Sequence, residues 1–270
     1  MKTVRKLVHV ATILLFAFAF FFPFSFIAQT DSGISTAKDA VYGEEGIDVL
    51  YSHTLGLSLF AHSRGAGLNF RYGKFFTDKK SHSFAFDLLY TKDLREELTS
   101  NPVYPEALPY VFGKVNSMVT LRFCLEKRRE ITPKLRKSGA QVGWLQRYGA
   151  TLGLLKPVYL IIGYPTIPYE NFIIEEYNPE EHFYDDIFGR SSWINGVDQI
   201  KVVPGFHYGF GFSFEYGGTR GLTKSLEAGG YADVYLKKME ILASEFVEPN
   251  RFFFGLYLKI EIGSNWTNAR

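Results

Sequence analysis

Two segments near the end of the chain alternate strictly between large apolar residues and small or polar ones. In residues 203–216, every second position from Phe206 to Tyr216 is aromatic, and histidine, glycine, serine and glutamate fill the positions between them. In residues 252–263, every second position from Phe252 to Ile262 is large and apolar. A period of two is typical of β-strands, and about 9–11 residues are needed for a tilted strand to cross a bilayer. The opposite face of glycine and charge suits the polar interior of a transmembrane barrel.

Other parts of the chain show the same alternation more weakly. These segments are 55–62, 67–76, 82–92, 113–125, 139–162 and 224–237. We expect 139–162 to form either one long strand or two short ones around Tyr148–Thr151. Because single-chain bacterial barrels have even strand numbers, a continuous segment favours eight strands, with ten as the alternative. The predicted fold is therefore all-β, an antiparallel up-and-down transmembrane β-barrel over residues 49–266.

The N-terminal segment 1–28 has the organisation of a secretory signal peptide. Lys2, Arg5 and Lys6 precede an apolar run from about Val10 to Ala28. We expect cleavage near Ala28, with a retained membrane anchor as the alternative because the apolar run is long. Residues 29–48 are rich in small, polar and charged types and are predicted to be a flexible lead-in.

No later segment has the ~20 continuous apolar residues of a spanning helix. Since only helices and closed barrels satisfy their backbone groups in lipid, an exported membrane form of this chain must be a barrel. This reasoning predicts a location in the outer membrane of a Gram-negative cell, in contact with its lipid, including lipopolysaccharide.

The lengths of the connections predict which end of the barrel faces outward. The connections at 93–110, 163–202 and 238–250 are long, whereas those at 77–81 and 217–223 are short, and membrane barrels carry their longer loops outside. The loops at 93–110 and 163–202 are the predicted contact surfaces for other envelope proteins. A basic segment at about 126–138 is predicted to be a longer turn at the inner end.

The inward faces of the predicted strands carry charges of both signs. An eight-stranded barrel is just wide enough inside for its own side chains. We therefore expect these residues to pair and fill the lumen, with a narrow permeation path as the alternative. The predicted polar network consists of Arg71, Asp87, Arg122, Arg147, His207, Glu215, Glu227, Asp233, Lys259 and Glu261.

An acidic group surrounds His182 in the longest predicted loop. Its members are Glu175, Glu176, Glu180, Glu181, Asp185 and Asp186. Oxygen ligands suit Ca²⁺, so the group is either a solvated loop or a site that bridges Ca²⁺ to lipopolysaccharide or a partner. The spacing matches no EF-hand, and no metal site is predicted.

Other residues were considered for catalysis. His62 and Ser63 suggest a membrane-embedded hydrolase or acyltransferase, but such a site needs a carboxylate within hydrogen-bond reach. His207 and Glu215 are too far apart along one strand to touch. The single cysteine, Cys124, is predicted to be a buried, unreactive thiol, and one cysteine excludes an internal disulfide. We predict no catalytic or cofactor-binding residues.

Three segments resemble uncharacterised outer-membrane barrels of the Bacteroidota: Tyr110–Asn116, Gly153–Tyr159 and Glu227–Asp233. The resemblance implies fold and location and assigns no residue roles. We expect a structural or accessory role in the envelope, alone or as a subunit of a larger complex. The alternatives are a narrow channel or porin-like protein, a lipid hydrolase or acyltransferase, and a soluble β-sandwich or lipocalin-like binder. A net charge of +2 gives no basis for nucleic-acid binding.

Overall fold

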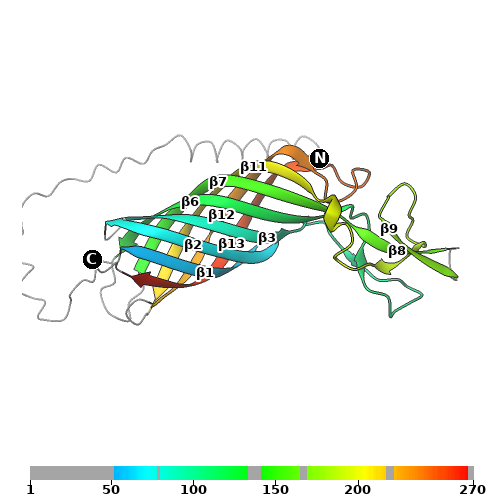
Figure 1. Cartoon of the computed structure of the whole chain (residues 1–270), viewed down its shortest axis with the longest axis horizontal. Helices are drawn as coiled ribbons and strands as arrows, with labels where there is room; N and C mark the ends of the chain where they lie inside the picture. Colours follow the sequence, from blue (N-terminus) through cyan, green and yellow to red (C-terminus); the bar gives the residue numbers. More distant parts are fainter. Residues whose placement is uncertain (1–51, 78–79, 133–140, 165–168, 217–221, 267–270) are drawn as a thin grey trace, which may run out of the picture. The chain divides into compact units, whose positions relative to one another are not determined.

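Eight long strands form a closed antiparallel barrel in a computed structural model that describes residues 52–77, 80–132, 141–164, 169–216 and 222–266 (Figure 1). The order around the barrel is β1-β13-β12-β11-β7-β6-β3-β2, so each strand pairs with its neighbours along the chain and the last pairs with the first. The barrel strands are β1 (His53–His62), β2 (Gly65–Thr77), β3 (Lys80–Thr91), β6 (Asn116–Thr132), β7 (Gln141–Pro157), β11 (Lys201–Tyr216), β12 (Leu222–Met239) and β13 (Asn250–Trp266).

The predicted eight-stranded up-and-down barrel is confirmed. Segment 139–162 supplies one barrel strand, because β7 pairs continuously with β6 and β11 through Tyr148–Thr151. The predicted signal peptide at 1–28 and the lead-in at 29–48 lie outside the described residues. Within the described part, no helix is long and apolar enough to span a membrane.

The alternation of the sequence becomes an alternation of burial. In β3, buried and exposed residues alternate along all twelve positions. Phe84, Phe86 and Leu88 are exposed on the outer face, whereas Ser83, Ala85 and Asp87 are buried inside. Because side chains in a strand point alternately to opposite faces, the barrel strands have a largely apolar outer face and an inner face that carries buried polar, small and some large apolar residues.

The predicted turn at 126–138 is partly wrong, because β6 continues to Thr132. Glu126 and Arg128 continue the inward face of β6, while Lys127 and Arg129 are exposed on the outer face. The run of charges obscured the period of two at this point. The remaining residues of the predicted turn, 133–140, lie outside the described part.

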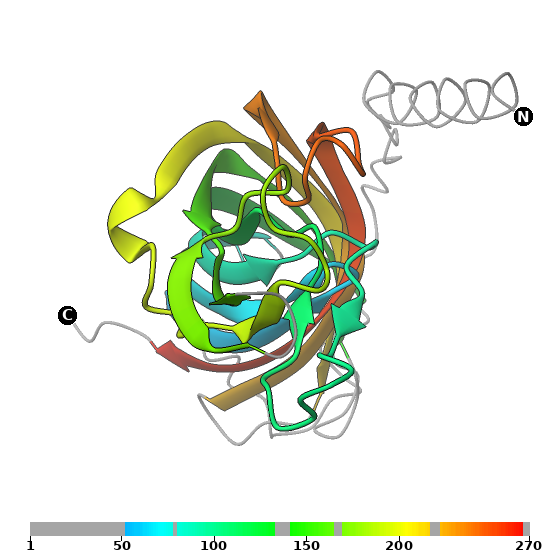
Figure 2. The ribbon, with the colours of Figure 1, turned by 90° about the vertical axis from the view of Figure 1, so that its right-hand side faces the viewer.

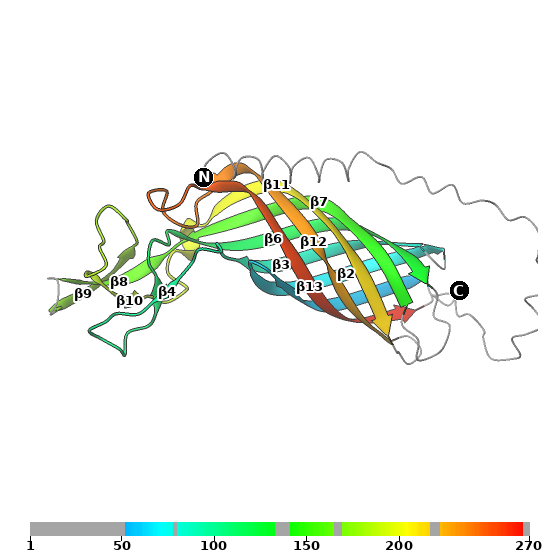
Figure 3. The same cartoon turned by 180° about the vertical axis from the view of Figure 1, so that it is seen from behind.

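The long connections at one end of the barrel carry secondary structure of their own (Figures 1 and 3). Between β3 and β6, the short strands β4 (Leu98–Thr99) and β5 (Tyr110–Val111) pair with each other. Between β7 and β11, a three-stranded sheet has the order β10-β8-β9, followed by a short 3-10 helix, η1. These elements are β8 (Tyr159–Tyr164), β9 (Asn171–Glu176), β10 (Ile187–Arg190) and η1 (Val197–Gln199). We call this three-stranded sheet the distal sheet; Figure 2 shows it from this end, in front of the barrel.

Candidate functional site

The buried centre of the lumen is Glu227 on β12. Its carboxylate accepts hydrogen bonds from Arg147 Nη2 at 2.5 Å and Arg128 Nη2 at 3.2 Å, and lies 2.8 Å from Lys259 Nζ. The Tyr257 hydroxyl donates a further bond at 2.9 Å. One carboxylate therefore organises three cations that come from three different strands.

Two other carboxylates extend this network toward the turn end. Glu126 accepts from Arg147 Nε at 2.8 Å and pairs with Arg128 at 3.2 Å. Glu261 accepts from Arg71 through both Nε and Nη2, at 3.1 and 2.5 Å. Since Arg147 bonds to both Glu126 and Glu227, the cations bridge carboxylates on different strands and tie the barrel wall together.

Toward the loop end, Asp233 holds the second part of the network. It accepts from Arg122 Nη2 at 2.5 Å and lies 2.6 Å from His207 Nδ1. The Arg122 guanidinium lies over the Tyr231 ring, with 4.5 Å between its central carbon and the ring centroid. Asp87 lies 3.7 Å from the other arm of Arg122.

Asn69 connects the two parts of the network. Its side-chain amide donates to Asp87 at 2.5 Å, and its carbonyl oxygen accepts from Lys259 at 3.4 Å and from Ser58 at 3.3 Å. A continuous path of hydrogen bonds and ion pairs thus runs along the lumen from Arg71 to His207.

The charges of this lumen network cancel. Its cations are Arg71, Arg122, Arg128, Arg147 and Lys259, and its carboxylates are Asp87, Glu126, Glu227, Asp233 and Glu261. The structure brings together all of the predicted lumen residues except Glu215, which lies farther toward the turn end of β11 and is partly exposed. Sequence reasoning missed Glu126 and Arg128 because it ended the strand before them.

An apolar layer covers the network on the side of the long loops. It consists of Met118, Leu155, Val203, Tyr235, Met239, Ile241 and Phe253, all buried. Below it, a second apolar group packs beside the charges: Phe60, Leu89, Tyr231 and Tyr257. Charged and apolar side chains therefore fill the middle of the lumen and its loop side in the described part of the chain.

The long loops are tied to one another above this layer. Lys114 Nζ lies 2.6 Å from Glu96 Oε2 and donates to the Tyr90 hydroxyl at 3.0 Å. The Ala243 N–H donates to the carbonyl of Gly113 at 2.8 Å. The last bond connects the loop between β3 and β6 with the loop between β12 and β13 at the loop end of the barrel.

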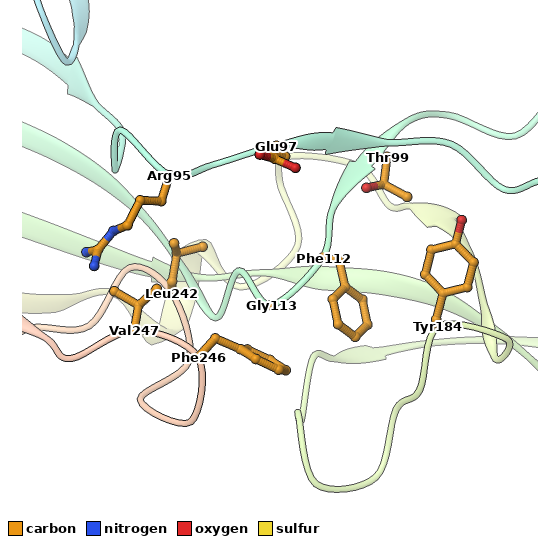
Figure 4. A pocket seen from close by; sticks show the side chains of 9 residues that line it. All are labelled: Arg95, Glu97, Thr99, Phe112, Gly113, Tyr184, Leu242, Phe246 and Val247. Atoms are coloured by element: carbon orange, nitrogen blue, oxygen red, sulfur yellow. The ribbon is translucent and has the colours of Figure 1, made fainter.

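A hollow of about 300 Å³ lies where the three long loops meet (Figure 4). Phe112, Tyr184 and Phe246 line it, with ring centroids 5.7 Å apart for Phe112–Phe246 and 6.1 Å apart for Phe112–Tyr184. Arg95 and Glu97 lie at its margin. Arg95 is already paired with Asp93 at 2.8 Å, and this hydrogen bond lowers the pKa of Asp93. The hollow is suited to an apolar or aromatic group.

Two candidate catalytic residues of the sequence analysis, His62 and His207, lie beside the same ring, that of Tyr231, with centroid distances of 5.6 and 6.3 Å. His62 Nδ1 lies 3.0 Å from the Tyr231 hydroxyl, and His207 bonds to Asp233, not to Glu215. Cys124 is buried on the inner face of β6.

The predicted acidic loop is divided between a strand and a turn. Glu175 and Glu176 belong to β9, and Glu175 Oε1 lies 3.8 Å from Nε2 of the buried His182. His182 Nδ1 accepts from the N–H of Asn178 at 3.1 Å. Among the described residues, no group of three histidine, cysteine or acidic side chains could hold a metal ion.

Fold and site define a small, closed, eight-stranded barrel with a charge-neutral, filled lumen. No protein-family model matches the chain, and no curated protein matches its sequence. Solved structures with a similar arrangement include Neisserial surface protein A (NspA), which is 6% identical, with 80% of this chain and 97% of that chain covered and a TM-score of 0.39.

Two further solved structures are also similar. Ail, the attachment invasion locus protein of Yersinia pestis, solved in complex with the heparin analogue sucrose octasulfate, is 10% identical, with 80% and 100% covered and a TM-score of 0.40. The N-terminal β-barrel domain of Pseudomonas aeruginosa OprF is 9% identical, with the same coverage and a TM-score of 0.35.

Proposed function

We propose that this chain is a non-conducting outer-membrane barrel that anchors the distal sheet and its neighbouring loops outside the cell, as a structural or accessory component of the envelope. The observation that carries the proposal is the filled lumen inside an apolar belt. The resemblance to outer-membrane barrels of the Bacteroidota rests on segments 110–116, 153–159 and 227–233 and stays a prediction. Export by the predicted signal peptide also stays a prediction.

The outer surface of the barrel supports a location in lipid. Large apolar residues are exposed on seven of the eight barrel strands, and the outward-facing Trp144 and Leu152 of β7 are half-buried; on β13 the exposed residues recur from Phe252 to Ile262. Soluble monomers rarely expose contiguous apolar patches larger than a few hundred Å². A belt that continues around a closed barrel exceeds this size and matches the lipid-facing band of membrane barrels. The same belt disfavours the soluble alternative.

A basic collar marks the limit of the apolar belt at the turn end, and the lengths of the loops support the orientation. In the backbone register, Lys80 on β3 lies opposite Arg129 on β6, and Arg129 lies opposite Trp144 on β7. Lys224 on β12 lies opposite Tyr216 on β11. These residues lie near the ends of their strands, at the limit of the apolar belt, where long basic side chains reach the head groups. The long loops then lie on the opposite, outer side, where lipopolysaccharide is the expected lipid contact.

Two measurements test this proposal. The chain is expressed with its own N-terminal segment, the envelope is fractionated, and samples are compared on gels with and without boiling; recovery in the outer membrane with a heat-dependent mobility shift is expected. Purified barrel in planar bilayers is expected to give no discrete conductance. Reproducible single-channel steps would overturn the filled lumen and favour the channel alternative, and recovery in the soluble periplasmic fraction would overturn the membrane location.

The proposal assigns no catalysis to the described residues. A lipid hydrolase or acyltransferase needs histidine, serine and a carboxylate in mutual reach near the lipid face. His62 is hydrogen-bonded to Tyr231, and His207 is bonded to Asp233 inside the filled lumen. Release or transfer of acyl chains from lipid A by the purified barrel, lost in the variants His62→Ala or His207→Ala, would contradict this assignment.

A further inference from the structure

One edge of the distal sheet is open. The sheet has the order β10-β8-β9, and among the described residues β9 pairs only with β8. Phe172, Ile173 and Ile174 follow one another along β9 and are 52, 50 and 55% exposed. Such an edge strand is a template for pairing with another strand, because its outward N–H and C=O groups can form hydrogen bonds and both of its faces carry apolar side chains.

The opposite edge of the same sheet is covered. On β10, the carbonyl of Ile187 accepts from Asn101 Nδ2 at 3.0 Å, and the N–H of Arg190 donates to the carbonyl of Leu108 at 3.2 Å. Both partners belong to the loop between β3 and β6. The fold therefore protects one edge of the sheet and leaves the β9 edge accessible, although natural proteins usually block such edges with charges, proline or a covering segment.

The open edge is held on a rigid support. Ile173 pairs with Ile162 on one face of the sheet, where a buried cluster contains Tyr110, Leu160, Ile162, Tyr177 and Ile187. Burial in this cluster raises the pKa of both Tyr110 and Tyr177. On the other face, the Phe172 ring lies 4.8 Å from the Phe188 ring. Because β9 is already a strand paired with β8, an added strand does not require β9 to fold on binding.

The charge around β9 indicates the chemistry of the partner. Residues 159–190 contain seven carboxylates and one arginine, Arg190. The carboxylates are Glu170, Glu175, Glu176, Glu180, Glu181, Asp185 and Asp186. A second copy of the chain would bring this acidic segment against itself, which is unfavourable when like charges lie opposite each other. A strand with alternating apolar and basic residues would place its apolar side chains beside Phe172 and Ile174 on one face. Its basic side chains would lie on the other face, beside Ile173 and Glu175, and would compensate the negative charge.

We propose that the open edge of β9 binds an extended basic segment of a partner protein by strand addition. The incoming strand pairs with Asn171–Glu176 and adds a fourth strand to the distal sheet, so that its main chain supplies affinity and its alternate side chains supply specificity. This inference deepens the accessory role proposed above and rests on it for the outward location of the sheet.

The test uses the purified full-length barrel in detergent micelles and a fluorescently labelled peptide of alternating lysine and valine with blocked ends. Binding is followed by fluorescence anisotropy, and protection of the amides of residues 171–176 is followed by hydrogen exchange. We expect saturable binding with new protection on β9. An alternating glutamate–valine peptide of the same length is expected to bind about tenfold or more weakly, because its charge repels the acidic sheet.

Matched variants locate the binding surface. Ile173→Lys places a like charge on the edge facing the basic peptide and is expected to weaken binding about tenfold. The control Ile194→Lys adds the same charge at an exposed site outside the distal sheet, and affinity within roughly twofold of the wild type is expected. Heat-dependent gel mobility of both variants checks that the barrel is folded.

Several results would overturn the inference. The first three are no saturable binding at millimolar peptide, equal binding of the two peptides, and an equal loss of binding in both variants. The fourth is a concentration-dependent dimer of the barrel that Ile173→Lys dissociates, because a second copy of the chain would then occupy the β9 edge. Failure of the proposed function, a non-conducting outer-membrane barrel, can be distinguished from failure of strand addition, because the former is tested by fractionation and conductance without any peptide. A barrel that fractionates to the outer membrane and binds no peptide contradicts only the strand-addition inference.

Discussion

Replacing Glu227 by glutamine tests the lumen network at its centre. The substitution keeps the size of the side chain and removes one negative charge, so Arg128, Arg147 and Lys259 lose their shared counter-ion and the balanced set of five cations and five carboxylates becomes positive. Removing one partner of a buried ion pair typically costs about 3–5 kcal/mol, because the remaining charge stays buried and uncompensated. Glu227 is fully buried, so we expect E227Q to lower the free energy of unfolding by an amount in this range.

The assay is urea unfolding of the barrel in lipid vesicles, followed by tryptophan fluorescence and by the heat-dependent gel shift. The matched control is Glu248→Gln, which removes the same charge from a side chain that is 87% exposed and 3.6 Å from Lys238. Surface pairs contribute about 0–1 kcal/mol, so this variant is expected to unfold nearly as the wild type does.

A double variant separates lost charge balance from lost packing. Adding Lys259→Met to E227Q restores the balance between cations and carboxylates and removes the 2.8 Å contact altogether. We expect it to recover part of the loss, with a coupling of about 0.5–3 kcal/mol between the two sites. An E227Q variant within about 1 kcal/mol of the wild type, or strictly additive effects of the two substitutions, would refute the view that the network acts as one electrostatic unit.

Three further predictions concern the loops and the lumen. Lys114→Met removes the ion pair with Glu96, and we expect faster hydrogen exchange at residues 93–97 with little change in barrel unfolding. The lowered pKa of Asp93 means that its contribution to loop stability is complete above its ordinary pKa and is lost as pH falls through the lowered value. Asp93→Asn should therefore remove the acid-dependent part of amide hydrogen exchange in this loop below about pH 4. An unchanged acid dependence of the exchange rates would count against the Asp93–Arg95 bond. Cys124 is buried in the filled lumen, so a small charged thiol reagent should label it only after unfolding; rapid labelling of the folded barrel would indicate an open path.

The barrel was predictable because its signal is local and repeated. Each strand alternates with a period of two, and the inward-facing polar residues follow from counting positions along it, as for Asn69 and Arg71 on β2 or Glu227 and Asp233 on β12. What failed was the end of β6, where consecutive charges hide the alternation. Lys127 and Arg129 face outward and Arg128 faces inward, a distinction that depends on pairing with β3 and β7.

The distal sheet was not predictable in the same way. Segment 163–202 was expected to be a loop, and β9 contains three successive apolar residues followed by two glutamates, so it has no period of two. Its strands form because β8 extends the chain beyond β7 and supplies an edge, and because residues of a distant loop, Asn101 and Leu108, cover β10. The hollow between Phe112, Tyr184 and Phe246 likewise depends on contacts among three loops that are far apart in the sequence.

The lumen network also explains why the strands adopt one register. Replacing a buried ion network by apolar residues is often neutral or stabilising, so stability alone does not account for ten charged residues inside a small barrel. The outer faces of these strands are apolar, and a lumen that was also apolar would leave both faces of each strand equally suited to lipid. A shift of β6 by one residue would turn Arg122 and Arg128 to the outside and place Phe123 inside. Since an arginine at the lipid face costs about 2–4 kcal/mol near the bilayer centre, the charges penalise every odd shift of register. We infer that the network contributes more to the choice of face and register than to net stability.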